Sequence, residues 1–170
     1  MSWFLASEDG ALLVTEAENP IIAVQALRES VLESVAAHLA LAIPEVPVER
    51  ARRAPVDIRQ FPRLIVVGTT MVPDETQSPG ETFWTIGFTI MGFARGDDDL
   101  DCEQTLTMLH ARVVAELQAA ELGSASVMPT TGHVEFATYT ADNSSAVAGD
   151  FAVNFDALAV APTGSPYAPV

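Results

Sequence analysis

The stretch from Glu81 to Ala94 constrains the fold of this 170-residue chain more than any other part of the sequence. Its residues, ETFWTIGFTIMGFA, alternate between large apolar and small or polar types, which is the period-two pattern of a β-strand. At about 3.3 Å per residue, these residues would span roughly 46 Å, far more than an ordinary strand. Such a strand must bend, at Gly87 or Gly92, or one of its ends must project as a hairpin arm.

Both faces of this long strand carry apolar side chains. One face carries Trp84, Ile86, Phe88 and Ile90, as is typical of a strand beneath a layer of helices. The second face carries Phe83, Met91 and Phe93 around smaller residues. Exposure of these apolar side chains to water is unfavourable. We therefore expect helices to cover one face of the strand and another subunit to cover part of the other face.

Two helices are predicted from apolar stripes at helical spacing. The first covers residues 20–42, because Asn19 is a good N-cap, proline suits the first turn, and further prolines follow residue 42. The second begins at Asp98 or Asp99 and is expected to end at Gly123, since glycine commonly terminates a helix.

Four further segments have strand character. Residues 46–53 suit a short edge strand because of their prolines, and residues 64–70 are apolar on both faces, as in a central strand. Residues 133–140 and 151–160 are the last two strands. Between the central strand and the long strand lies MVPDETQSPG, residues 71–80, which we predict to be the loop of a hairpin.

This order of elements predicts an α+β fold. We expect a mostly antiparallel sheet of four to five strands, two main helices packed on one face, and a long β-hairpin arm. The length suits a single domain over residues 1–170, with residues 1–18 as an N-terminal arm and 161–170 as a flexible C-terminal tail. No apolar run is long enough to span a bilayer, so we expect no membrane association.

The net charge of −15 excludes a nucleic-acid clamp, which needs a basic footprint, but it allows DNA to pass nearby. The local exception is a group of arginines: Arg50, Arg52, Arg53, Arg59 and Arg63. Two interpretations stay open. The arginines either protect a solvated edge strand against pairing with another sheet, or they contact an acidic neighbouring subunit.

No pattern of catalytic or metal-binding residues stands out. The acidic run at Asp97, Asp98, Asp99 and Asp101 fails as a calcium loop, because the required glycine and final glutamate are missing, and it suits a helix N-terminus instead. His38, His110 and His133 lie far apart in sequence, and Cys102 falls on a helix stripe that is expected to be buried. We therefore predict no enzyme activity, no metal and no cofactor.

The segments PRLIVVGTT, ETFWTIGFTIMGFA and LTMLHARVVAEL, in this order of elements, resemble the tail terminator (tail completion) proteins of long-tailed bacteriophages over about residues 20–160. The resemblance implies a homohexameric ring that caps the tail tube, ends its growth and joins it to the head-completion or connector protein. It implies a place at the tail neck of the virion, and in the host cytoplasm during assembly. DNA would pass through the ring without specific binding. The longer N-terminal arm and proline-rich C-terminus leave another neck or minor tail component as an alternative.

In such a ring, two groups of residues become candidate contacts. The subunit or partner contact comprises Arg50, Arg52, Arg53, Arg59, Phe83, Met91 and Phe93. The loop that docks on the tail tube protein comprises Val72, Pro73, Asp74, Glu75, Thr76, Gln77 and Ser78. An alternative class is a cellular small-molecule-binding α+β domain, which would require a pocket lined by His133, Tyr139 and Asp156.

Overall fold

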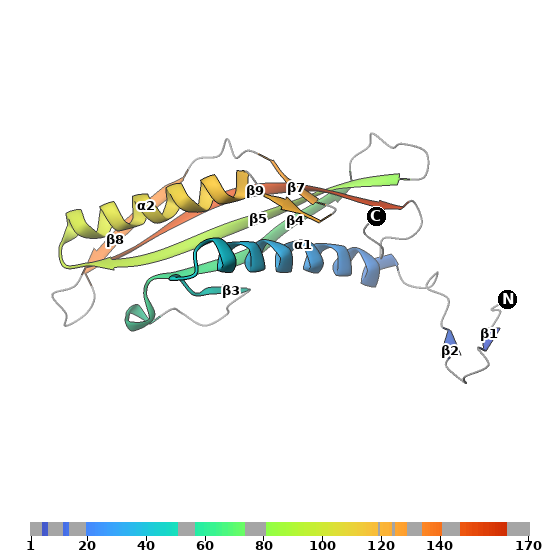
Figure 1. Ribbon diagram of the computed structural model, residues 1–170, viewed down its shortest axis with the longest axis horizontal. Coiled ribbons are helices and arrows are strands. Elements are labelled where there is room, and N and C mark those ends of the chain that lie inside the picture. Colours follow the sequence, from blue (N-terminus) through green and yellow to red (C-terminus); the bar gives the residue numbers. More distant parts are fainter. Residues whose placement is uncertain are drawn as a thin grey trace.

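Two helices pack against one side of a seven-stranded sheet, which confirms the predicted α+β class (Figure 1). This computed structural model describes residues 5–6, 12–13, 20–50, 57–73, 81–118, 120–123, 125–128, 134–140 and 147–162. The helices are α1 (Pro20–Ala42) and α2 (Asp99–Gln118). Helix α1 has the predicted bounds.

The sheet is larger than the four to five strands expected. Its order is β3 (Val48–Arg50), β4 (Arg63–Pro73), β5 (Glu81–Gly96), β9 (Val147–Pro162), β7 (Ala125–Val127) and β6 (Glu121–Leu122), with β8 (Glu135–Thr140) also paired to β9. Strand β3 is parallel to β4, and every other pair is antiparallel. The two-residue strands β1 (Leu5–Ala6) and β2 (Leu12–Leu13) form a separate pair. Strand β3 confirms the middle of the predicted edge strand over residues 46–53: residues 46 and 47 precede β3 without strand structure, and residues 51–53 lie outside the described part.

The predicted long strand is the centre of the sheet. It begins at Glu81 as expected and continues to Gly96, and all 16 of its residues pair with β9, from Glu81 opposite Pro162 to Gly96 opposite Val147. The expected hairpin of β4 and β5 is also present. Because β9 lines the other side of β5 along its whole length, the hairpin belongs to a broad three-stranded surface.

The packed core lies on the helix side of this sheet. Val66, Ile90 and Val153 sit in register on neighbouring strands and are buried. Two residues further along the same side of β5 and β9, the rings of Phe88 and Phe155 stack with centroids 5.5 Å apart. Where their side chains are described, the helices bury most of the predicted stripes: Leu27, Val31, Leu32, Val35 and Leu39 from α1, and Cys102, Leu106, Leu109, Val113 and Leu117 from α2.

The acidic run starts helix α2, as predicted. The Asp98 carboxylate accepts a hydrogen bond from the backbone N–H of Asp101 at 2.8 Å, which is the geometry of an N-cap. The Asp101 carboxylate accepts the N–H of Asp97 at 3.0 Å. These carboxylates satisfy backbone donors that the first turn leaves without helical partners.

Two predicted boundaries are wrong. Helix α2 ends at Gln118 and not at Gly123, which instead lies between β6 and β7 with a φ of 64°, a left-handed conformation suited to a tight turn. The loop expected over residues 71–80 begins later, because Met71, Val72 and Pro73 belong to β4. Val72 pairs with Thr85 and Pro73 pairs with Trp84. Residues 74–80 lie outside the described part of the chain.

Candidate functional site

The candidate site is the side of β4, β5 and β9 that faces away from α1 and α2, here called the helix-free face. Strand alternation and register place these residues there: Ile65 and Val67 from β4; Phe83, Thr85, Gly87, Thr89, Met91 and Phe93 from β5; and Asp150, Ala152, Asn154, Asp156, Leu158 and Val160 from β9. In Figure 1 both helices lie on the opposite side of these strands. The sequence therefore correctly predicted that β5 has a second face without helix cover.

Apolar side chains gather at both ends of the helix-free face. At one end, Phe83 pairs with Val160, and Leu158 lies next along the same side; all three are half-buried. At the other end, Met91 lies between Ile65 and Ala152. Half-burial leaves part of Phe83, Leu158, Val160 and Met91 in contact with water, although these are residue types that favour full burial.

The centre of the face is polar. The Thr89 hydroxyl donates to Oδ1 of Asn154 at 2.6 Å. Beside this pair lies Gly87, which is buried although it has no side chain. A Cβ atom at Gly87 would press on the Thr70 hydroxyl and lie 3.3 Å from Oδ1 of Asp156. A shift of register between Gly68 and Thr70 brings this part of β4 against Gly87. The sequence placed small residues at the middle of this face, but the hydrogen bond between Thr89 and Asn154 was not foreseen, because it depends on the pairing of β5 with β9.

One apolar end is partly covered by the chain itself. Phe61 follows the short 3-10 helix η2 (Ile58–Gln60), and its ring packs against Phe93 with centroids 5.4 Å apart. Phe61 and Ile65 are buried here, apart from the main core. Of the three predicted contact residues of β5, Phe93 thus packs against another ring of its own chain. Phe83 and Met91 are half-buried and remain partly accessible to a partner.

The arginine group is paired within the chain wherever the structure describes it. A guanidinium nitrogen of Arg50 lies 2.6 Å from a carboxylate oxygen of Glu29, which ties edge strand β3 to α1. Arg59 forms hydrogen bonds with Asp57 that lower the pKa of this carboxyl to about 2. Arg63 forms an ion pair with Glu49. Arg52 and Arg53 lie outside the described residues, so the role of the group in a contact stays a prediction.

The residues suggested for a small-molecule pocket do not converge. Tyr139 lies opposite Ala148 of β9, and Asp156 lies opposite Gly87. Positions 148 and 156 are about 26 Å apart along an extended strand. His133 is outside the described residues.

The remaining reactive groups are dispersed. The ring of His110 packs edge-on against Phe136 and Phe151, and its buried Nε2 atom has no hydrogen-bond partner among the described residues. Burial lowers the pKa of His110 and raises that of the Cys102 thiol. In the part of the chain that the structure covers, no three metal-ligating side chains come together, and neither helix is long and apolar enough to cross a membrane.

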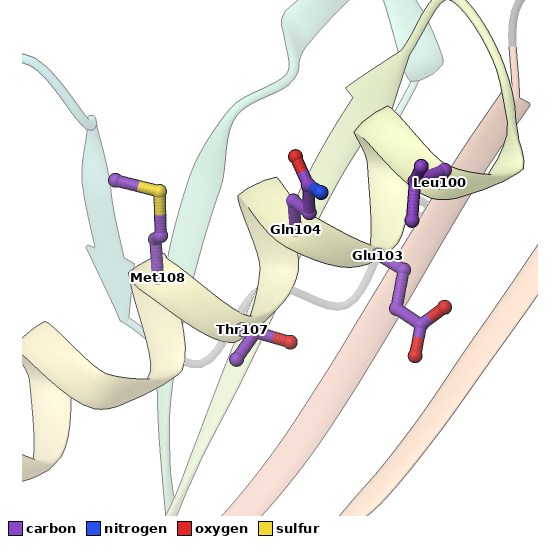
Figure 2. Close-up of a pocket in the computed structure, with 5 residues that line it drawn as sticks. All are labelled: Leu100, Glu103, Gln104, Thr107 and Met108. Carbon is purple, nitrogen blue, oxygen red and sulfur yellow. The ribbon is translucent and has the colours of Figure 1, made fainter.

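The outer surface of α2 carries two shallow hollows. Figure 2 shows the side chains of the first, about 340 Å³ in volume, which is lined by Leu100, Glu103, Gln104, Thr107 and Met108. The second, about 260 Å³, lies between α2 and the segment that precedes β3. Leu100 and Met108 are largely exposed, at 63% and 68%. Neither hollow gathers a set of acid, base and nucleophile that would support catalysis.

No family model matches the chain. The search of curated proteins also gives no match. Among solved structures, the chain is similar to a protein of the "Virion of native gene transfer agent (GTA) particle", with 15% sequence identity and a TM-score of 0.37. The similarity covers 83% of this chain and 99% of that one. A TM-score this low transfers neither a fold nor a role from that particle to this chain.

Proposed function

We propose that this chain is a structural virion protein that forms a homohexameric ring, caps a phage tail tube, ends its polymerisation and forms the head–tail joining interface. The observation that carries the proposal is the helix-free face, where a broad three-stranded surface lacks a helix layer and presents apolar side chains at both ends. The sequence resemblance to tail terminator proteins agrees with this role.

Burial of this face against a neighbouring subunit would stabilise the ring. Removal of apolar surface from water contributes about 25 cal/mol per Å². The exposed Asp156 carboxylate in the polar centre would fix the register of the contact, because a misaligned neighbour would bury this charge without a partner. A closed ring uses such a surface without leading to open fibres.

The net charge of −15 fits a channel for DNA. Carboxylates around the lumen of the ring would repel phosphate, so DNA would pass without specific binding. We further propose that the protein has no catalytic activity and needs no cofactor or metal, so its work consists of contacts with copies of itself, with the tail tube protein and with the head-completion or connector protein.

The tip of the β4–β5 hairpin is the proposed docking point for the tail tube. Val72 is 55% exposed and Pro73 is also exposed at the end of β4, where two long strands meet. Residues 74–80 connect this end to β5, and among them Asp74 to Ser78 are mostly polar, so they contribute little to a core.

The test replaces Met91 with glutamate, with Met108→Glu on the outer surface of α2 as the matched control. Met91→Glu places a charge in the proposed subunit contact, where desolvation is costly. We expect a folded protein with ring assembly reduced at least about tenfold and tails of abnormal length in particles imaged by electron microscopy. Met108→Glu should assemble normally. Tails of normal length and joined to heads with Met91→Glu would exclude this face from the ring.

A further inference from the structure

Strand β8 offers an open edge to a partner. It pairs through residues 135–140 with residues 147–152 of β9, and no strand in the described part of the chain pairs with its other side. Residues 136–139 are all exposed, and the two aromatic side chains among them, Phe136 and Tyr139, are exposed to 45% and 43%. An unpaired strand edge presents a row of N–H and C=O groups that another strand can bind.

The edge strands β3 and β6 of this sheet are short and charged. Strand β3 has three residues, of which Glu49 and Arg50 are held in ion pairs with Arg63 and Glu29. Strand β6 has two residues, including the exposed Glu121. By contrast, residues 136–140 of β8 read FATYT, without charge or proline. Charge and shortness protect natural strand edges against pairing, whereas β8 has six residues and its one charge, Glu135, lies at its first position.

The edge is also held in a fixed position before any partner arrives. The Phe136 ring packs with His110 of α2 at 5.5 Å and lies 6.1 Å from the ring of Phe151. Six residues in register with β9 fix the strand from the other side. A partner strand would therefore bind a preformed edge, which reduces the entropy cost of association.

The uncharged stretch of residues 136–140 favours a second copy of this chain as the occupant. Two copies of a chain with net charge −15 repel each other over most of their surfaces. The segment FATYT is a place where they can meet without opposing carboxylates. A twofold axis at Thr138 would align two β8 strands antiparallel, with Tyr139 opposite the second copy's Ala137 and Phe136 opposite its Thr140. Each large side chain then lies beside a small one.

We propose that a second copy of this chain adds its β8 to β8, which joins two sheets across a twofold axis. This contact closes after two copies and so does not propagate into fibres. It does not use the helix-free face, and it stands independently of the proposed ring. Its occurrence before assembly would mask an edge that could otherwise pair with other strands.

The test measures the mass of the full-length protein by analytical ultracentrifugation. The proposed twofold axis brings two copies of residue 138 together, so Thr138→Glu and Thr138→Lys should each halve the mass of the wild-type species, because like charges oppose each other. An equimolar mixture of the two variants should restore the wild-type mass. The matched control, Thr107→Glu on the exposed side of α2, should leave the mass unchanged.

The salt dependence of association is an independent test of the same contact. Because the proposed contact is uncharged and the chain is strongly acidic, added salt should strengthen association by screening repulsion. The proposal fails if the wild type is monomeric at the highest soluble concentration. It also fails if Thr138→Glu keeps the wild-type mass, if the mixture of variants does not reassociate, or if salt weakens the association.

Discussion

His110 shows how one residue can couple the stability of the fold to pH. Its ring packs edge-on against both Phe136 and Phe151, at centroid distances of 5.5 and 5.4 Å, and its Nε2 atom is buried without a partner among the described residues. Burial disfavours the charged imidazolium and lowers the pKa of His110 from its ordinary value of 6.5. The folded chain therefore takes up this proton less readily than the unfolded chain does.

The sign of the resulting pH dependence follows from this lowered pKa. His110 favours folding above the ordinary pKa, and its contribution is lost as the pH falls through the lower pKa of the folded state. We predict that His110→Leu keeps or slightly raises the free energy of unfolding at pH 7, because an apolar side chain leaves no buried nitrogen unpaired. Between pH 7 and pH 5 the variant should lose less stability than the wild type in denaturant titrations. Equal losses would contradict this account of His110.

At the residue scale, the sequence predicts interactions between residues that lie close together along the chain. The cap at Asp98 and the buried stripe from Cys102 to Leu117 are visible because their partners lie within a few turns of the same helix. The ion pair between Arg50 and Glu29 is not visible, since these residues are 21 positions apart and meet only after β3 packs beside α1.

At the element scale, the long strand and both helices are predictable because each has many residues over which a period can be recognised. Strands β6 and β7 have two and three residues, which is too few to show a period. Gly123 is ambiguous for the same reason, because glycine suits both a helix end and a hairpin turn with positive φ. The faces of β5 follow from alternation, but the partners of its central residues depend on the register with β9 and on the β4 register shift.

The tie between β3 and α1 provides a test at this scale. Arg50→Glu would place two carboxylates together where Arg50 and Glu29 now pair, so we expect a loss of at most about 1 kcal/mol in the free energy of unfolding, as is usual for an exposed pair. The reversed pair Glu29→Arg with Arg50→Glu should recover most of that loss. The comparison requires urea unfolding of the wild type, both single variants and the double variant. Additive single effects would show that the pair does not hold the edge strand.

At the scale of the whole molecule, neither described helix covers one broad face of the sheet, while the charge of −15 opposes non-specific association. A chain with these two properties needs a specific, shape-matched partner for the helix-free face. We infer that this partner is another copy in a ring, and the sequence alone cannot specify the geometry of that ring, because it depends on surfaces brought together only by β4, β5 and β9.

The most direct test is to determine the symmetry and copy number of this protein at the end of the tail by electron cryomicroscopy of assembled particles. Our account predicts a closed ring of six copies that caps the tail tube, with Phe83 and Met91 of each copy buried against its neighbour. A single copy per tail, or a ring in which the helix-free face remains open to solvent, would contradict it.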